Sequence, residues 1–161
     1  MRFKYLLLGF MLLILAGSMT AISAADTDEI GILDEKIFTI PEDFEIMNQS
    51  GEYAYLENSD GNQSIVIMVR STDPNKILSL YEQVGYEFND TYRTYQRGIY
   101  KVSEIGFTYE DYIGLLFACE NGNDRVYILH SFLNEDDFPT DEDMLALKLI
   151  SSLQDNLWFF Y

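Results

Sequence analysis

Two apolar runs joined by a tight turn constrain the fold of this chain more than any other feature. Residues 112–119 and 125–133 are rich in β-branched, aromatic and leucine residues, which favour strands. The joint, Glu120-Asn121-Gly122-Asn123-Asp124, contains Asn and Gly, which tolerate the positive φ of a tight reversal. The pattern predicts a β-hairpin with its turn centred on Gly122 and Asn123.

The two faces of this hairpin are both apolar. Side chains alternate across a strand, so the turn places Cys119 opposite Val126 and Leu115 opposite His130. A hairpin on the surface would have one polar face, whereas strands that are apolar on both faces are covered on both sides. We expect this hairpin to lie in the centre of a sheet, covered by helices or by a second sheet.

The remaining elements are predicted from apolar periodicity, turns and caps. Strands are expected over residues 36–40, 52–57, 63–70 and 99–107, whereas residues 86–96 give no clear assignment. Asp73-Pro74 predicts a helix start and Gly85 its end, and Pro139-Thr140 predicts the opening of a last helix. The order hairpin, helix, about three strands, helix predicts an α+β fold with a mainly antiparallel central sheet.

The N-terminus has the pattern of a secretory signal peptide. Arg2 and Lys4 precede an apolar stretch over residues 5–16, and Ser23 and Ala25 form a small-x-small cleavage site before Asp26. The alternative is an uncleaved membrane anchor, although the apolar stretch is short for a span. We therefore expect residues 1–25 to be a signal peptide, 26–35 an acidic flexible leader and 36–161 a single globular domain.

The charge of the chain excludes some partners. Its net charge is −17 at pH 7, and nucleic acid and anionic lipid both need a basic footprint. We expect no nucleic-acid partner, and membrane contact only through an uncleaved signal segment. The expected location is secreted or at the extracellular cell surface, with N-terminal membrane anchoring as the alternative. The single cysteine, Cys119, excludes an internal disulfide.

Two short motifs resemble the PsbP/Mog1-like proteins. The segment Phe38-Thr39-Ile40-Pro41-Glu42-Asp43-Phe44 is similar to their opening F-x-I-P-x-x-F, and Leu149-Ile150-Ser151-Ser152-Leu153 is similar to their ending. With the element order between them, the resemblance covers about residues 36–155. It implies an α/β/α sandwich in which helices cover a central antiparallel sheet. It also implies an accessory or binding protein without catalytic residues.

The sequence shows no marked catalytic or metal site. Cys119 and His130 would share a face of the hairpin but lie about four residues apart, or ~13 Å, which is too far for a dyad. We expect both to be core residues. Oxygen donors at 58–62 and 135–137 do not match the EF-hand spacing, and capping or solvated turns explain them more simply. No phosphate-binding glycine loop is present, so we expect no metal or other cofactor.

Three N-x-S/T sequons are candidate N-glycosylation sites in an exported chain. Their acceptors are Asn48, Asn62 and Asn89. Each falls in a predicted loop or near a strand end, where a glycan could be accommodated. The alternative is chance occurrence in a chain rich in Asn and Ser.

A candidate partner-contact surface lies within residues 86–101. Its members are Tyr92, Arg93, Tyr95 and Arg97, and basic residues gather there in an otherwise acidic chain. Tyr and Arg are common interface anchors. The alternative is that the tyrosine rings cover the sheet and the arginines neutralise neighbouring carboxylates.

The expected function is an exported, non-enzymatic binding or accessory domain at the cell surface, with an unknown protein or glycan partner. One alternative is an enzyme that uses carboxylates, such as a glycoside hydrolase, which would need two of them flanking a cleft. The other alternative is a structural component of the cell envelope.

Overall fold

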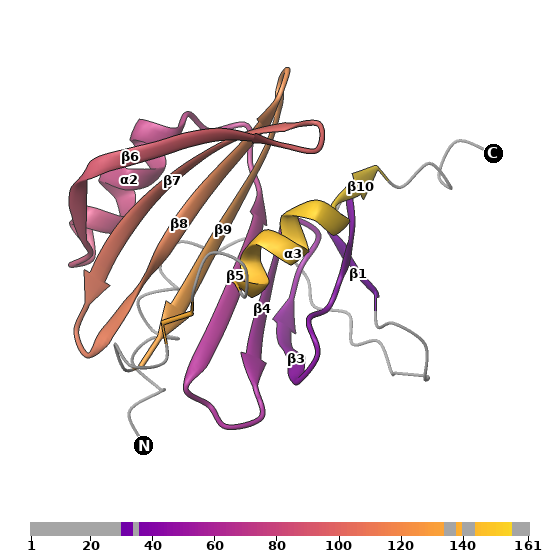
Figure 1. Cartoon of the computed structure of the whole chain (residues 1–161), viewed down its shortest axis with the longest axis horizontal. Coiled ribbons are helices and arrows are strands. Elements are labelled where there is room, and N and C mark those ends of the chain that lie inside the picture. The colour runs from indigo at the N-terminus through magenta and orange to yellow at the C-terminus, as the bar shows by residue number, and fades with distance from the viewer. Residues whose placement is uncertain (1–29, 34–35, 134–137, 140–143, 156–161) are drawn as a thin grey trace.

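The computed structural model describes residues 30–33, 36–133, 138–139 and 144–155 (Figure 1). The predicted signal peptide lies outside the described residues, as do the first part of the predicted leader, Thr140 and the aromatic C-terminus from Leu157.

A seven-stranded antiparallel sheet forms most of the described structure, in the order β3-β4-β5-β9-β8-β7-β6. The first three strands form one meander and the last four form another, and β5 pairs with β9 to join them (Figure 1). The strands are β3 (Phe44–Gln49), β4 (Tyr53–Asn58), β5 (Gln63–Val69), β6 (Glu87–Arg97), β7 (Tyr100–Tyr109), β8 (Tyr112–Asn121) and β9 (Asp124–Phe132).

The predicted central hairpin is confirmed as β8–β9. Leu115 pairs with His130, and Cys119 pairs with Val126, so the predicted register is correct. Gly122 in the turn has φ +61°, a conformation that glycine adopts without strain. Both strands are flanked by other strands, which places the hairpin inside the sheet.

One face of the sheet packs against a small sheet and the C-terminal helix. The small sheet has the order β1-β2-β10, with β1 at Ile30–Leu33, β2 at Lys36–Thr39 and β10 at Gln154–Asp155. Helix α3 (Leu145–Ser152) precedes β10. The core on this face includes Leu33, Phe38, Leu56, Ile67, Phe117, Ile128, Leu149 and Ile150.

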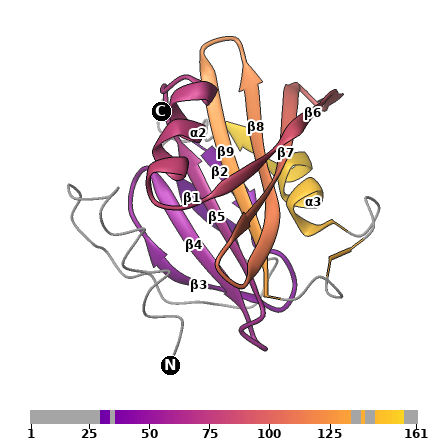
Figure 2. The same ribbon diagram turned by 90° about the vertical axis from the view of Figure 1, so that its left-hand side faces the viewer.

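Helix α2 (Pro74–Gln83) lies against the opposite face, as Figure 2 shows. Its Ile77 and Tyr81 join a second core with Tyr86, Phe107 and Leu129. The predicted start of this helix is confirmed, because Asp73 caps it by accepting from the Asn75 amide at 2.9 Å. The two cores explain why the hairpin strands are apolar on both faces.

The predicted α+β fold, an α/β/α sandwich with helices covering the sheet, is wrong. The described residues contain only two helices, of ten and eight residues, beside ten strands, so the fold is mostly antiparallel β. On one face the cover is shared by β1 and β2, which contribute Leu33 and Phe38, and by the single short helix α3, which contributes Ala146, Leu147, Leu149 and Ile150. Helix α3 also begins later than predicted, at Leu145, after Met144, which makes no side-chain cap.

The expected flexible leader at residues 26–35 contains a strand. Ile30–Leu33 forms β1 and pairs along its length with β2, with Leu33 fully buried. Burial of alternate residues anchors this part of the segment to the core.

Candidate binding surface

Strand β6 is the last strand of the large sheet and carries all four candidate contact residues. Tyr92 pairs with Ile105, whereas Arg93 pairs with Glu104 and Tyr95 with Val102. Because side chains alternate, Tyr92 points to one face of the sheet and Arg93, Tyr95 and Arg97 to the other. The structure therefore brings three of the four predicted residues together and separates Tyr92, which is 51% exposed.

The buried carboxylate of Glu104 binds two of these side chains. The Tyr95 hydroxyl donates to Glu104 Oε2 at 2.8 Å, and Arg93 Nη1 lies 3.4 Å from Glu104 Oε1. The Arg93 guanidinium also lies 5.9 Å from the centre of the Tyr95 ring. Burial, followed by the hydrogen bond to Glu104, raises the pKa of Tyr95, so its hydroxyl stays protonated and able to donate. For Arg93 and Tyr95 the structure agrees with the alternative from the sequence, in which the tyrosine ring covers the sheet and the arginine neutralises a neighbouring carboxylate.

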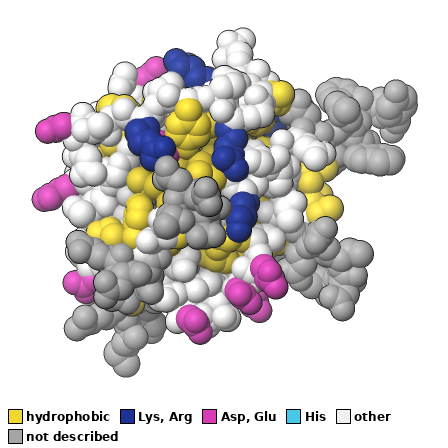
Figure 3. Space-filling model, viewed as in Figure 1, with side chains coloured by type: hydrophobic (Ala, Val, Ile, Leu, Met, Phe, Trp, Pro, Cys, Tyr) yellow, Lys and Arg dark blue, Asp and Glu magenta, His cyan; other side chains and the backbone are white. Residues whose placement is uncertain are grey.

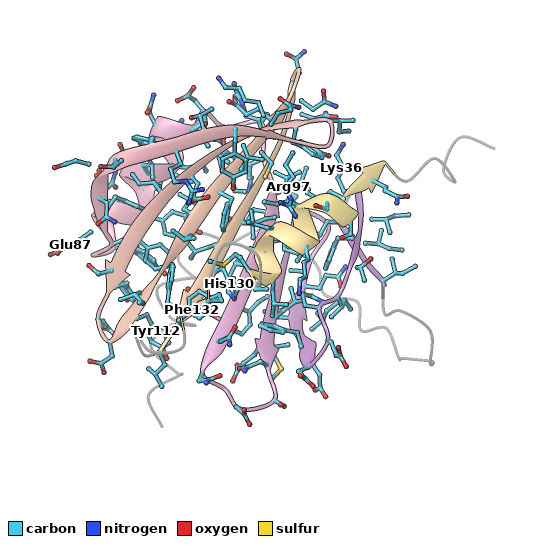
Figure 4. All side chains as sticks on the ribbon, viewed as in Figure 1. Lys36, Glu87, Arg97, Tyr112, His130 and Phe132 are labelled. Carbon is cyan, nitrogen blue, oxygen red and sulfur yellow. The ribbon has the colours of Figure 1, made fainter. Side chains whose placement is uncertain are left out.

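Arg97 has a different role, because it reaches across to helix α3. Its Nε donates to Ser151 Oγ at 2.7 Å, and the Ser151 hydroxyl donates to the Leu147 carbonyl at 3.0 Å. Lys148 is exposed and lies three residues before Ser151, so both occupy the same side of the helix. Figure 4 shows Arg97 beside α3.

We call the side chains Arg93, Tyr95, Arg97, Lys148 and Ser151 the β6–α3 surface. Figure 3 shows basic side chains gathered around apolar ones on this face of the molecule, with most acidic side chains nearer the margins.

Two basic residues of the β6–α3 surface have no carboxylate partner within the described part of the chain. Ion pairs join Lys36 to Asp124, Arg70 to Glu52, Arg93 to Glu104 and Arg125 to Glu120. Arg97 and Lys148 form no ion pair with any residue that the structure describes.

Lys148 and Ser151 are members that the sequence analysis missed. They lie about fifty residues after β6, and nothing in the sequence shows that α3 packs beside that strand. The available signal was the i, i+3 spacing of Lys148 and Ser151 on a helix whose one other polar residue is Ser152.

The three sequons occupy different environments. Asn48 lies within β3 and is partly buried, and Asn62 lies in the β4–β5 turn, where its Oδ1 accepts from Asn58 at 2.7 Å. Asn89 is exposed in the irregular part of β6, although its Nδ2 lies over the backbone of Gly106. Glycosylation at these positions stays a prediction.

Cys119 and His130 are confirmed as core residues, both fully buried. Burial raises the pKa of the Cys119 thiol to about 12 and lowers the pKa of His130 to about 3. His130 Nε2 lies 3.3 Å from Gln63 Oε1, and its Nδ1 has no hydrogen-bond partner in the described structure. The ring packs against Phe132, with 4.2 Å between centroids.

No group of three or more His, Cys, Asp or Glu side chains placed to hold a metal occurs within the described ranges. In the loop at 58–62, the Asn58 side chain accepts from the amides of Asn62 and Gln63, which organises a turn. The acidic residues at 135–137 lie outside the described ranges. In the part of the chain that is described, no helix is long and apolar enough to cross a membrane.

Comparisons with known proteins add little. No family model and no curated protein matches the chain. A crystal structure from Bacteroides thetaiotaomicron VPI-5482 is similar, with 16% identity and a TM-score of 0.47, over 75% of this chain and 45% of that one. The chain thus spans less than half of that protein. The resemblance to PsbP/Mog1-like proteins receives no support from these comparisons.

Proposed function

We propose that this protein is an exported binding domain at the cell surface, and that it holds its partner on the β6–α3 surface. The observation that supports the proposal is the position of Arg97, which is anchored to Ser151 of α3 next to the exposed Lys148. Neither cation has an acidic partner among the described side chains. The signal-peptide pattern at residues 1–25 supports export.

The geometry around Arg97 favours binding over a purely structural role. Arginine loses much side-chain freedom when it binds a partner, and prior ordering reduces that cost. The hydrogen bond from Nε to Ser151 Oγ restrains the side chain and leaves the terminal nitrogens without a bond to described residues. A side chain held in this way is ready to bind an anionic group.

The test measures binding of the exported chain to cell envelopes of its native source. Arg97→Ala is expected to weaken binding about tenfold, because the loss of one hydrogen bond to a charged group lowers the affinity by roughly that factor. The matched control is Lys76→Ala, which removes an exposed cation from α2 on the opposite side of the sheet.

The melting temperature of Lys76→Ala should match that of the wild type, because Lys76 is exposed. Arg97→Ala should stay folded with a slightly lower melting temperature, because the half-buried Arg97 loses its hydrogen bond to Ser151. Equal loss of binding in both variants would show only a general charge effect. Unchanged binding of a folded Arg97→Ala protein would place the contact surface elsewhere.

A further inference from the structure

We infer that the segment after β10, residues 156–161, folds back over the outer face of the small sheet and covers its exposed isoleucines. The inference concerns a surface other than the β6–α3 surface and does not depend on the proposed function. It is carried by three observations: an exposed apolar face on β1 and β2, the point at which the chain leaves that face, and the apolar composition of the residues that follow.

The small sheet has one buried face and one outward face. Paired residues of antiparallel strands point to the same side of a sheet, and burial alternates along β1 and β2 accordingly. Leu33 and Phe38 point into the core, whereas Ile32 and its partner Ile37 point outward, as does Ile30. Ile30 is 60% exposed, Ile32 is 43% exposed and Ile37 is partly buried. We call these three side chains, Ile30, Ile32 and Ile37, the isoleucine face.

The chain leaves the small sheet beside the isoleucine face. Strand β10 pairs with β2, where Gln154 lies opposite Ile37. Gln154 is therefore in the same cross-strand row as Ile37 and Ile32, and its side chain is exposed. Figure 1 shows β1, β2 and β10 side by side. Neighbouring strands are about 4.8 Å apart, so the backbone of β1 lies roughly 10 Å from that of β10.

The segment after β10 is long enough to cross the isoleucine face. Residues 156–161 follow β10 directly, and an extended chain of this length spans at most about 20 Å. The first of them is Asn156, a residue type that favours the turn needed to reverse the direction of the chain. The reach of the segment therefore exceeds the distance from β10 to β1, even after a turn.

The composition of the segment matches the face that it covers. Residues 157–161, with the sequence Leu-Trp-Phe-Phe-Tyr, are all apolar or aromatic. A buried aromatic side chain removes about 150–250 Å² of surface from water. Strand β10 has only two residues, so few backbone hydrogen bonds hold the chain at this place. Burial of the following rings on the isoleucine face holds β10 against β2 more firmly.

A segment of the same chain fits the isoleucine face better than a second copy of the protein does. Three partly exposed isoleucines offer far less area than the ~800 Å² that each partner contributes to a stable interface. A tethered segment needs no such area, because a short tether gives an effective concentration in the millimolar range. Ile99 is also exposed, but it is a single side chain in the turn between β6 and β7 and offers less apolar area.

The sequence contains a single tryptophan, Trp158, so tryptophan fluorescence reports the exposure of this segment directly. The experiment measures the emission maximum and the acrylamide quenching of the purified chain, in buffer and in denaturant. We expect emission at a shorter wavelength and weaker quenching in buffer, both independent of protein concentration. Values equal to those in denaturant would overturn the inference. Shielding that is lost on dilution would also overturn it, because a second copy would then cover the ring.

Substitutions on the isoleucine face identify what shields the tryptophan. Ile30→Ser and Ile32→Ser should each shift the emission to longer wavelength and increase quenching, and both should stay folded because the side chains are exposed. The matched controls are Tyr92→Ser and Ile99→Ser, which remove side chains of similar exposure from other places and should change neither quantity. If neither isoleucine-face variant changes the emission, whether or not Ile99→Ser does, the segment packs elsewhere and the inference is wrong.

Truncation after Asp155 gives a second readout, because removal of residues 156–161 should uncover the isoleucine face. A dye that fluoresces on apolar surfaces should bind more strongly to the truncated chain, and Ile32→Ser in that chain should lower the binding again. Equal dye binding by the full and truncated chains would contradict the inference. An unfolded truncated chain would bind the dye regardless of Ile32, and the quenching of Trp158 in the full chain then decides.

Discussion

Glu104 is the buried carboxylate that organises the side chains on one face of β6 and β7. It is only 7% exposed, and a buried charge is tolerated when it is paired and hydrogen-bonded. Tyr95 and Arg93 provide those bonds, so removing either would leave the carboxylate under-satisfied. Arg93 is therefore a poor choice for a binding test, and Arg97 is a better one.

His130 should make the protein less stable in acid. Its pKa is about 3 in the folded chain, because burial disfavours the charged ring, against an ordinary value of 6.5. Between these values the unfolded chain binds one more proton at this site, so the free energy of unfolding falls as the pH is lowered from 6.5 towards 3. The contribution is about 1.4 kcal/mol for each pH unit.

The measurement compares urea unfolding of the wild type and His130→Gln at several pH values between 4 and 6.5. Because carboxylates titrate in both proteins, the informative quantity is the difference in slope. The wild type should lose about 1.4 kcal/mol more per pH unit than the variant. Parallel curves would show that His130 accepts a proton in the folded state.

At the scale of elements, the contact between β7 and β8 depends on a glycine. Gly114 pairs with Phe107, and a Cβ built at Gly114 would lie 2.5 Å from Phe107 Cζ. It would also lie 2.2 Å from the carbonyl oxygen of His130 in β9. The Phe107 ring thus fills the space on this face of the sheet that a side chain at position 114 would need.

Gly114→Ala should therefore destabilise the protein by about 2 kcal/mol or more, because the backbone of a central strand cannot move away cheaply. The matched control is Gly51→Ala, where a Cβ would meet nothing within 4 Å and a change below ~0.5 kcal/mol is expected. Chemical denaturation of both variants gives the comparison. Equal stabilities would mean that β7, β8 and β9 pack less closely than described.

The elements that could be predicted are those with strong local signals. The β8–β9 hairpin has a turn sequence and two apolar faces, and α2 has Asp73 as a cap and Pro74 at its start, so both were predicted correctly. Strand β6 was not assigned, because an edge strand exposed along most of its length shows no apolar alternation. Strand β10 has two residues and forms only by pairing with distant β2.

At the scale of the whole molecule, the sequence showed that the central strands are covered but not what covers them. The apolar pattern of a strand shows that both its faces are buried. It does not show whether a helix, a second sheet or large side chains bury them, because each does so equally well. Only part of the β6–α3 surface could be predicted, for a related reason. Arg97 was found in a local cluster, whereas Lys148 and Ser151 reach it only through the packing of α3 beside β6.

Mapping amide NMR shifts is the most direct test of whether the β6–α3 surface binds the partner. The isotope-labelled chain would be titrated with soluble extracts of the cell envelopes of its native source. We predict shift changes concentrated in residues 93–97 of β6 and 147–152 of α3, with α2 unaffected, and loss of these changes in Arg97→Ala. Changes concentrated on α2, or on β1 and β3, with β6 and α3 silent, would contradict it.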